Sequence, residues 1–282
     1  MSLVAACIIY RGEGYAYWLG GRSVSAGNVA SHFLGLFGLN PYWINSLIGV
    51  EWYLGDLFLF YLLVPLIRGR LKDLRSTGLA LAGSAATSLM LTAAAKLFLA
   101  EQIAGSPVVE AYILNFCLVQ QLPVFLLGAA LYYMIPEIRA GWNDTVCRRI
   151  AALCMIAAAG GMIFLMYFGT GPLPVALVSG VVFGLFFAGV RLFPAGHGKA
   201  SFLAQIGRVS YGIYLFHFLL LQVFRRAGIF QGDALSALSL RYLAAFAGTL
   251  ALAVMADRFL TKPVKRVLER KIFIAEHLIG RQ

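Results

Sequence analysis

Seven long apolar stretches constrain this chain more than any other feature of its sequence. Each is close to the roughly 20 residues that a helix needs to cross a hydrocarbon core about 30 Å thick. Backbone polar groups in lipid must be hydrogen-bonded within the structure, so we expect every stretch to be helical. The sequence therefore predicts an all-α, polytopic transmembrane bundle with spans at about 50–67, 78–100, 116–134, 150–168, 173–190, 209–225 and 240–259.

The overall composition supports a protein embedded in a membrane. Hydrophobic residues make up 61% of the chain and charged residues only 12%, whereas soluble domains carry about 25% charged residues. This excludes a soluble enzyme with a single apolar anchor. The cysteines lack the CxxC spacing of a metal site, so we predict no metal and expect free thiols packed as small hydrophobic residues at Cys7, Cys117, Cys147 and Cys154.

Basic residues gather in alternate connections between the predicted spans. They follow the first and the last span, and they lie in the connections after the third and the fifth, whereas the connections after the second and the fourth span hold none. By the positive-inside rule, the basic connections are cytoplasmic, the segment before residue 50 is external and the C-terminus is inside. Three arginines between the last two spans do not fit this pattern: Arg225, Arg226 and Arg241.

The C-terminal tail forms a second region of the chain. We divide the sequence into an integral membrane domain at 1–262 and a basic amphipathic cytoplasmic tail at 263–282. Its alternation of cationic and apolar residues favours a helix on an anionic inner leaflet. A calmodulin-like or nucleic-acid-binding tail is the less favoured alternative, and no nucleic-acid partner is predicted.

Polar side chains from four predicted spans fall in the outer half of the membrane. Asp56 lies about six residues, roughly 9 Å, below the outer boundary, and His217 about eight residues, roughly 12 Å, below it. An ionisable residue inside a membrane marks a functional-site hypothesis. We therefore predict that Asp56 and His217 face one internal cavity, with carboxylate and imidazole within about 8 Å to allow a bridging water. Gln120 and Gln121 lie at a similar depth, and Lys96 lies near the outer end of the span at 78–100.

Two interpretations of this polar cluster remain open. On the span at 209–225, Ser210, Tyr214 and His217 share one helical face, which suits a site. Alternatively, Asp56 and His217 only pair to make their burial tolerable. Lys96 suits snorkelling to the interface, and the two glutamines suit hydrogen bonds between helices. Packing or an interfacial belt also explains the aromatic residues Trp52, Tyr53, Tyr61, Tyr211 and Tyr214.

Four segments resemble, in order, the motifs of the acyltransferase 3 family of bacterial integral membrane acyltransferases. VEWYLGDLFLFYLLVPL resembles W-(S/F/Y)-L-x-x-x-x-x-F-Y-L-L-x-P, and QLPVFLLGAALYY resembles R-L-P-E-F-L-L-G-M-L-L. IGRVSYGIYLFHFLLL resembles L-G-x-I-S-Y-G-I-Y-L-W-H, and RFLTKPVKR resembles R-F-I-E-K-P. The first motif is matched at Trp52, Leu54, Phe60, Tyr61, Leu62, Leu63 and Pro65.

The resemblance implies a membrane topology, and it also implies that this chain lacks the first part of the family's domain. The family has ten helices with both ends cytoplasmic, so this chain would correspond to the last seven, as an N-terminally truncated or divergent member. The family's catalytic R-x10-H motif and its R-x-x-R motif would lie upstream. Arg22 and His32 do not stand in either motif, and no catalytic role is assigned to them.

Several positions depart from the family's motifs. Gln121 replaces an arginine, Val124 and Thr261 each replace a glutamate, and Asp56 stands one place before a frequent acidic position. These departures leave the catalytic residues unassigned, with His217 and Asp56 as candidate site-lining residues. The candidate substrate-binding residues are Trp52, Tyr61, Gln121, Ser210, Tyr211 and Tyr214.

The resemblance implies transfer of an acyl group, commonly acetyl from acetyl-CoA, to a hydroxyl of a cell-surface carbohydrate or lipid-linked sugar. Acyl-CoA would be a co-substrate, with no bound cofactor, and the location would be the bacterial cytoplasmic (inner) membrane. The basic loops suit acyl-CoA phosphates, although topology alone explains them. The alternatives are a catalytically inactive remnant or binding protein of the same fold and, less favoured without internal repeats, a transporter.

Overall fold

Helices make up all the regular structure in the described part of this computed structural model, which covers residues 16–19, 23–98, 101, 105–193, 202–229, 235–266 and 269. The α-helices are α2 (Ala16–Leu19), α3 (Ala26–Leu34), α4 (Trp52–Ile67), α5 (Leu74–Phe98), α7 (Pro107–Ala111), α8 (Leu118–Gly141), α9 (Asp144–Phe168), α10 (Val175–Leu192), α11 (Phe202–Arg226) and α12 (Leu235–Ala256). A 3₁₀-helix, η1 (Phe37–Leu39), and two π-helices, η2 (Tyr112–Phe116) and η3 (Asp257–Thr261), complete the set.

The predicted multi-pass membrane architecture is confirmed. Within the described residues, six helical segments are long and apolar enough to cross a membrane: Leu74–Phe98, Pro107–Gly141, Asp144–Phe168, Val175–Leu192, Ile206–Arg226 and Ser239–Arg266. The shorter apolar helix α4 has 16 residues, about 24 Å in length. Each predicted span overlaps one of these seven helices.

The helices extend beyond the apolar cores from which the spans were predicted. The α9 helix begins at Asp144 rather than near 150, because the Asn143 side chain accepts a hydrogen bond from the backbone N–H of Val146 at 3.0 Å. This cap places Arg148 and Arg149 inside the helix. Likewise, α11 begins at Phe202 rather than near 209, so Arg208 lies inside the helix. Hydropathy marks only the apolar part of a helix, whereas capping residues mark its start.

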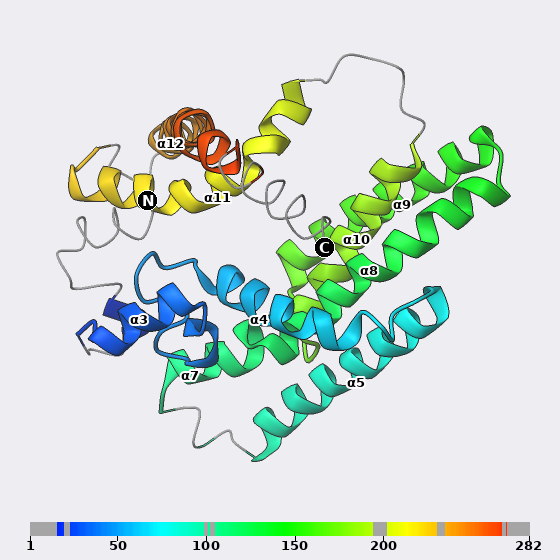
Figure 1. The fold of residues 1–282 in the computed structure, drawn as a ribbon, viewed down its shortest axis with the longest axis horizontal. Coiled ribbons are helices and arrows are strands. Elements are labelled where there is room, and N and C mark those ends of the chain that lie inside the picture. The colour runs from blue at the N-terminus through cyan, green and yellow to red at the C-terminus, as the bar shows by residue number, and fades with distance from the viewer. Residues whose placement is uncertain are drawn as a thin grey trace, which may run out of the picture. The chain divides into compact units, whose positions relative to one another are not determined.

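The structure divides into two compact units. One comprises Glu13–Gly196 and contains α2 to α10, and we call it the α2–α10 unit; the other comprises Met1–Gly12 with His197–Gln282 and contains α11, α12 and η3, and we call it the α11–α12 unit (Figure 1). Residues 1–15, including Cys7, and most of the predicted tail lie outside the described residues. The tail's first part, 263–266, continues the helix after η3. Cys117, Cys147 and Cys154 are free thiols.

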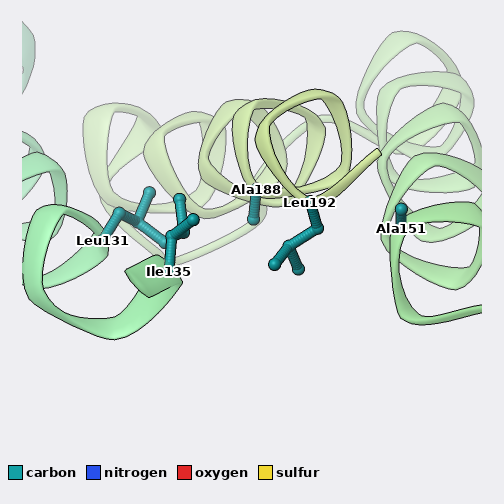
Figure 2. Packing of buried hydrophobic residues seen from close by; sticks show 5 residues of the cluster. All are labelled: Leu131, Ile135, Ala151, Ala188 and Leu192. Atoms are coloured by element: carbon teal, nitrogen blue, oxygen red, sulfur yellow. The ribbon is translucent and has the colours of Figure 1, made fainter. Parts of the chain in front are cut away.

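The core of the α2–α10 unit lies where α8, α9 and α10 pack together. Figure 2 shows the buried cluster, which comprises Leu131 and Ile135 of α8, Ala151 of α9, and Ala188 and Leu192 of α10. A Cβ added at Gly189 would lie 3.0 Å from the backbone oxygen of Ala151. The absence of a side chain there lets α10 approach α9 closely, which is how small residues commonly promote helix packing in membranes.

The two helices of the α11–α12 unit also meet at small residues. A Cβ added at Gly212 of α11 would lie 2.9 Å from the Cβ of Ala253 in α12, and Ala253 is buried. The two helices are therefore in close contact at this level. α11 carries His217 five residues beyond this contact.

Candidate functional site

The loop before α4 is organised around a buried glutamate. The carboxylate of Glu51, which is only 2% exposed, accepts hydrogen bonds of 2.6–3.2 Å from four successive backbone N–H groups, those of residues 47–50. Gly49 in this loop has φ of +93°, which glycine adopts without strain. Glu51 therefore fixes the loop directly before the first residue of α4.

His32 of α3 packs against this glutamate. Its Nδ1 donates to the backbone oxygen of Asn28 at 2.9 Å, and its Nε2 lies 3.5 Å from Oε1 of Glu51. The ring also stacks on Phe37, with centroids 4.2 Å apart. Both side chains of this pair are almost completely buried, at 3% and 2% exposed, so the histidine serves packing in a polar network.

This network was not recognised from the sequence. Asn28 donates from Nδ2 to Ser46 at 2.9 Å, and Asn45 accepts from the backbone N–H of Trp52 at 2.8 Å. The available signal was the spacing of Asn28, Ser31 and His32, which places three polar side chains on one face of a helix. The network anchors the N-terminus of α4 and the residues that follow it.

Asp56 follows Glu51 by five residues and lies in a different environment. Its side chain is completely buried, at 0% exposed, and neither carboxylate oxygen has a hydrogen-bond partner within the described parts of the chain. It interacts electrostatically with Tyr112 and Cys117. A buried carboxylate without a partner carries a large desolvation cost. Structural stability therefore does not explain an aspartate at this position.

A close contact between two backbones places Asp56 in the interior. A Cβ added at Gly55 would lie 2.8 Å from Cα of Gly38, and one at Gly38 would lie 2.9 Å from the carbonyl carbon of Gly55. Tyr112 also donates its hydroxyl to the backbone oxygen of Gly38 at 3.0 Å. This contact brings the first turns of α4 against η1 and holds Asp56 near η2.

The two glutamines of α8 both satisfy backbone oxygens of η2. Gln120 is completely buried: its Oε1 accepts from Ser88 at 2.5 Å, and its Nε2 donates to Thr92 at 3.0 Å and to the backbone oxygen of Ile113 at 3.1 Å. Nε2 of Gln121 donates to the backbone oxygen of Asn115 at 2.6 Å. Cys117 is extended and breaks the helix, so the glutamines compensate for the break, and Gln120 also links α8 to α5.

The other candidate residues of the α2–α10 unit pack against neighbours or are exposed at the surface. Trp52 packs on Phe116 at a ring separation of 5.3 Å, within an aromatic cluster. Tyr61 is 61% exposed. Lys96 is exposed at the end of α5 and donates to the backbone oxygen of Pro172 at 3.5 Å, and its snorkelling to the interface stays a prediction.

His217 lies half-buried near the middle of α11. Its Nδ1 is 2.6 Å from the backbone oxygen of Tyr214. A carbonyl oxygen only accepts hydrogen bonds, so we assign the proton to Nδ1, and the neutral ring then keeps its lone pair on Nε2. Nε2 has no hydrogen-bond partner among the described residues. This nitrogen can therefore accept a proton.

The remaining candidates on α11 lie within two turns of His217. Ser210 and Tyr211 are exposed, and Tyr214 is half-buried. His217 belongs to the α11–α12 unit and Asp56 to the α2–α10 unit, and their pairing stays a prediction. The described residues contain no group of three or more His, Cys, Asp or Glu side chains placed to hold a metal ion.

Comparison with known protein families gives a match over most of the chain. Residues 3–258 match the family model Acyl_transf_3, described as an acyltransferase domain. No curated protein and no solved structure match the chain. The family match covers nearly all of the chain, including α4 and α11 with their candidate residues. The chain therefore belongs to the Acyl_transf_3 family, and its apolar helices make it a membrane member of this family of acyltransferase domains.

Proposed function

We propose that this protein transfers an acyl group, commonly acetyl, from acyl-CoA to a hydroxyl of a cell-surface carbohydrate or lipid-linked sugar at the bacterial cytoplasmic membrane. The observation that carries the proposal is the geometry of His217. Nδ1 is engaged by the backbone oxygen of Tyr214, and Nε2, which has no hydrogen-bond partner among the described residues, can accept a proton. Acyl transfer to a hydroxyl requires such a base.

The reaction then proceeds without a further reactant. Nε2 of His217 takes the proton of the acceptor hydroxyl while the oxygen attacks the thioester carbonyl carbon. The carbon–sulfur bond breaks, an ester forms, and the thiol of CoA leaves with the proton returned by the imidazolium. Hydrogen-bond donors that face the developing oxyanion lower the barrier.

Asp56 contributes on the acceptor side in this proposal. Its buried carboxylate has no partner among the described residues, so it is available to accept hydrogen bonds from sugar hydroxyls. Bound acceptor would thereby offset the desolvation cost of the carboxylate. Trp52, Tyr61, Gln121, Ser210, Tyr211 and Tyr214 stay candidate acceptor-binding residues predicted from the sequence.

The function is tested with the purified full chain in proteoliposomes supplied with acetyl-CoA and a panel of polysaccharides and lipid-linked sugars. CoA release and acetylated product are both measured. We expect acceptor-dependent release, and His217→Gln should lower kcat by roughly 10²- to 10⁴-fold while leaving thermal unfolding unchanged. Release that is equal in the two proteins would contradict His217 as the base.

His32→Gln is the matched control for this measurement. Both ring nitrogens of His32 face protein groups, the backbone oxygen of Asn28 and the carboxylate of Glu51. Its loss should therefore lower the unfolding temperature with little change in kcat per folded molecule. If acetyl-CoA is not consumed with any acceptor by the folded wild-type protein, a catalytically inactive member of the family is the better description.

The pairing of Asp56 with His217 has its own test. In a background with the four native cysteines changed to alanine, Asp56→Cys and His217→Cys are combined and treated with a thiol cross-linker that spans about 8 Å, the separation expected with one bridging water. We expect an intramolecular cross-link, detected by mass spectrometry. No cross-link, with both thiols still reactive to a small maleimide, would exclude a shared cavity.

A further inference from the structure

A cavity of about 690 Å³ lies within the α11–α12 unit, between the N-terminal part of α11 and the end of α12 with η3. Ligand pockets in proteins commonly have volumes of about 300–1,000 Å³. The walls are mostly apolar, and they include Leu215, Phe216 and Val264. Arg208 and Lys265 line the cavity as well, so it combines an apolar interior with cationic groups.

Helix geometry explains why this space exists. α11 and α12 meet at Gly212 and Ala253, and both of these residues line the cavity. Beyond this contact α12 continues into η3, whose π-helical turn is closed by a hydrogen bond from the backbone N–H of Lys262 to the oxygen of Asp257. π-helical turns are wider than α-helical turns and are frequent at functional sites. Asp257, the first residue of η3, also lines the cavity.

The charges around the cavity leave a cationic excess. Asp257 lies 3.0 Å from Lys262, and the opposite charges of these two residues cancel in the total. Lys265 lies 3.7 Å from Glu269, but both side chains are more than 60% exposed, and such pairs are weak. The guanidinium of Arg208 is exposed and has no ion pair or hydrogen bond within the described residues. The rim therefore offers unneutralised positive charge to an anion.

Both cations lie at the same end of the helix pair, because α11 and α12 are antiparallel: Gly212 meets Ala253, and Gly248 meets Leu220. Arg208 is near the start of the apolar segment Ile206–Arg226, and Lys265 is near the end of Ser239–Arg266. Along α11 the lining runs from Arg208 to Phe216, about 12 Å, close to the roughly 15 Å of one hydrocarbon leaflet. A ligand with a phosphate at the membrane boundary and an alkyl chain below it matches this arrangement.

We propose that this cavity binds one anionic phospholipid of the bilayer, with its phosphate between Arg208 and Lys265 and an acyl chain against Leu215 and Phe216. Basic pockets between transmembrane helices are suited to anionic head groups. Acyl-CoA fits less well, because its several phosphates and its adenine need more cations and polar partners than this mostly apolar cavity provides. The proposal does not depend on the proposed acyltransferase reaction.

Binding is measured on the full chain in phosphatidylcholine nanodiscs that contain increasing phosphatidylglycerol, with retained lipid counted by native mass spectrometry. We expect one tightly retained phosphatidylglycerol per protein. The double variant Arg208→Gln with Lys265→Gln should weaken its binding roughly tenfold or more, whereas Arg208→Lys with Lys265→Arg keeps both charges and should retain it. Val264→Trp, which narrows the apolar part, should also weaken binding without a change in charge.

Arg148→Gln with Arg149→Gln is the matched control, because it removes two exposed charges of α9 that do not line this cavity. It should retain the bound lipid. Equal retention by the Arg208→Gln and Lys265→Gln double variant, or equal retention of phosphatidylcholine and phosphatidylglycerol, would overturn the proposal. Displacement of the lipid by acetyl-CoA at one equivalent would overturn it in favour of a donor site.

Discussion

The loop before α4 and the first turns of α4 each contain a buried carboxyl group, but the hydrogen bonding of the two groups is opposite. At Glu51 four backbone N–H groups surround a buried carboxylate. Five residues later, the equally buried carboxylate of Asp56 has no hydrogen-bond partner within the described residues. A buried carboxyl group that is well hydrogen-bonded organises the backbone, whereas one without partners only adds a cost. This difference in hydrogen bonding indicates that Glu51 is retained for structure and Asp56 for another reason.

Gln120 provides a neutral reference for this comparison. It is as buried as Asp56, yet its amide oxygen and nitrogen are both engaged by side chains of α5. Removal of a satisfied group leaves its partners unsatisfied, whereas removal of an unsatisfied group leaves nothing behind. Substitutions at Glu51, Gln120 and Asp56 should therefore change the free energy of unfolding by amounts that differ in sign as well as in size.

The largest effect is expected at Glu51. Glu51→Ala leaves four backbone N–H groups without their acceptor and removes the carboxylate that lies 3.5 Å from Nε2 of His32, and it should lower the free energy of unfolding by about 3 kcal/mol or more. Glu51→Gln, which keeps an acceptor oxygen, should lose less. Reversible unfolding in mixed detergent micelles measures both. A loss for Glu51→Ala no larger than that of an exposed residue would show that the loop is held by other contacts.

The next largest effect is expected at Gln120. Gln120→Leu leaves Ser88, Thr92 and the backbone oxygen of Ile113 without their hydrogen-bond partner. It should lower the free energy of unfolding by about 2 kcal/mol. Gln121→Leu, which loses one hydrogen bond to the backbone oxygen of Asn115, is the matched control and should lose less. The same unfolding measurement compares them, and an equal loss would mean that the link to α5 contributes little.

Asp56→Asn should have a smaller effect on stability and one of opposite sign. Replacing the unpartnered carboxylate by a neutral amide should raise the free energy of unfolding by about 1 kcal/mol, and in the proposed reaction it should lower acyl transfer. Glu51→Gln is the same chemical change and should be destabilising. A destabilised Asp56→Asn would reveal a structural partner for the carboxylate and weaken its assignment to the acceptor site.

The smallest effect is expected at a third carboxylate, Asp73, which precedes α5. The backbone N–H of Ser76 donates to it at 2.7 Å and, with the Ser76 hydroxyl, holds the pKa of this carboxyl below its ordinary value. A lowered pKa stabilises the folded state above the unfolded pKa, and this contribution is lost as the pH falls below about 4. Asp73→Ala should therefore fray the start of α5 at neutral pH but change little in acid, as hydrogen exchange would measure.

Much of the fold could be predicted from the sequence, because long apolar runs specify spanning helices. Helix starts were less predictable: Asn143 begins α9 through a cap that hydropathy does not register. The environment of Gln120 could not be predicted either, since Ser88 and Thr92 are distant in sequence and only packing brings them to α8. Asp56 was identified from its place in an apolar run, whereas Glu51, at the edge of that run, gave no such signal.

The contact between Gly38 and Gly55 has an evolutionary consequence. Neither position can accept a side chain while the other backbone stays in place, because an added Cβ would lie 2.8–2.9 Å from backbone atoms across the contact. A single mutation at either site meets the same steric barrier, and relief requires movement of α4 itself. Descendants of this sequence that keep α4 in position should therefore retain both glycines, and lineages that lose one should also change at Asp56.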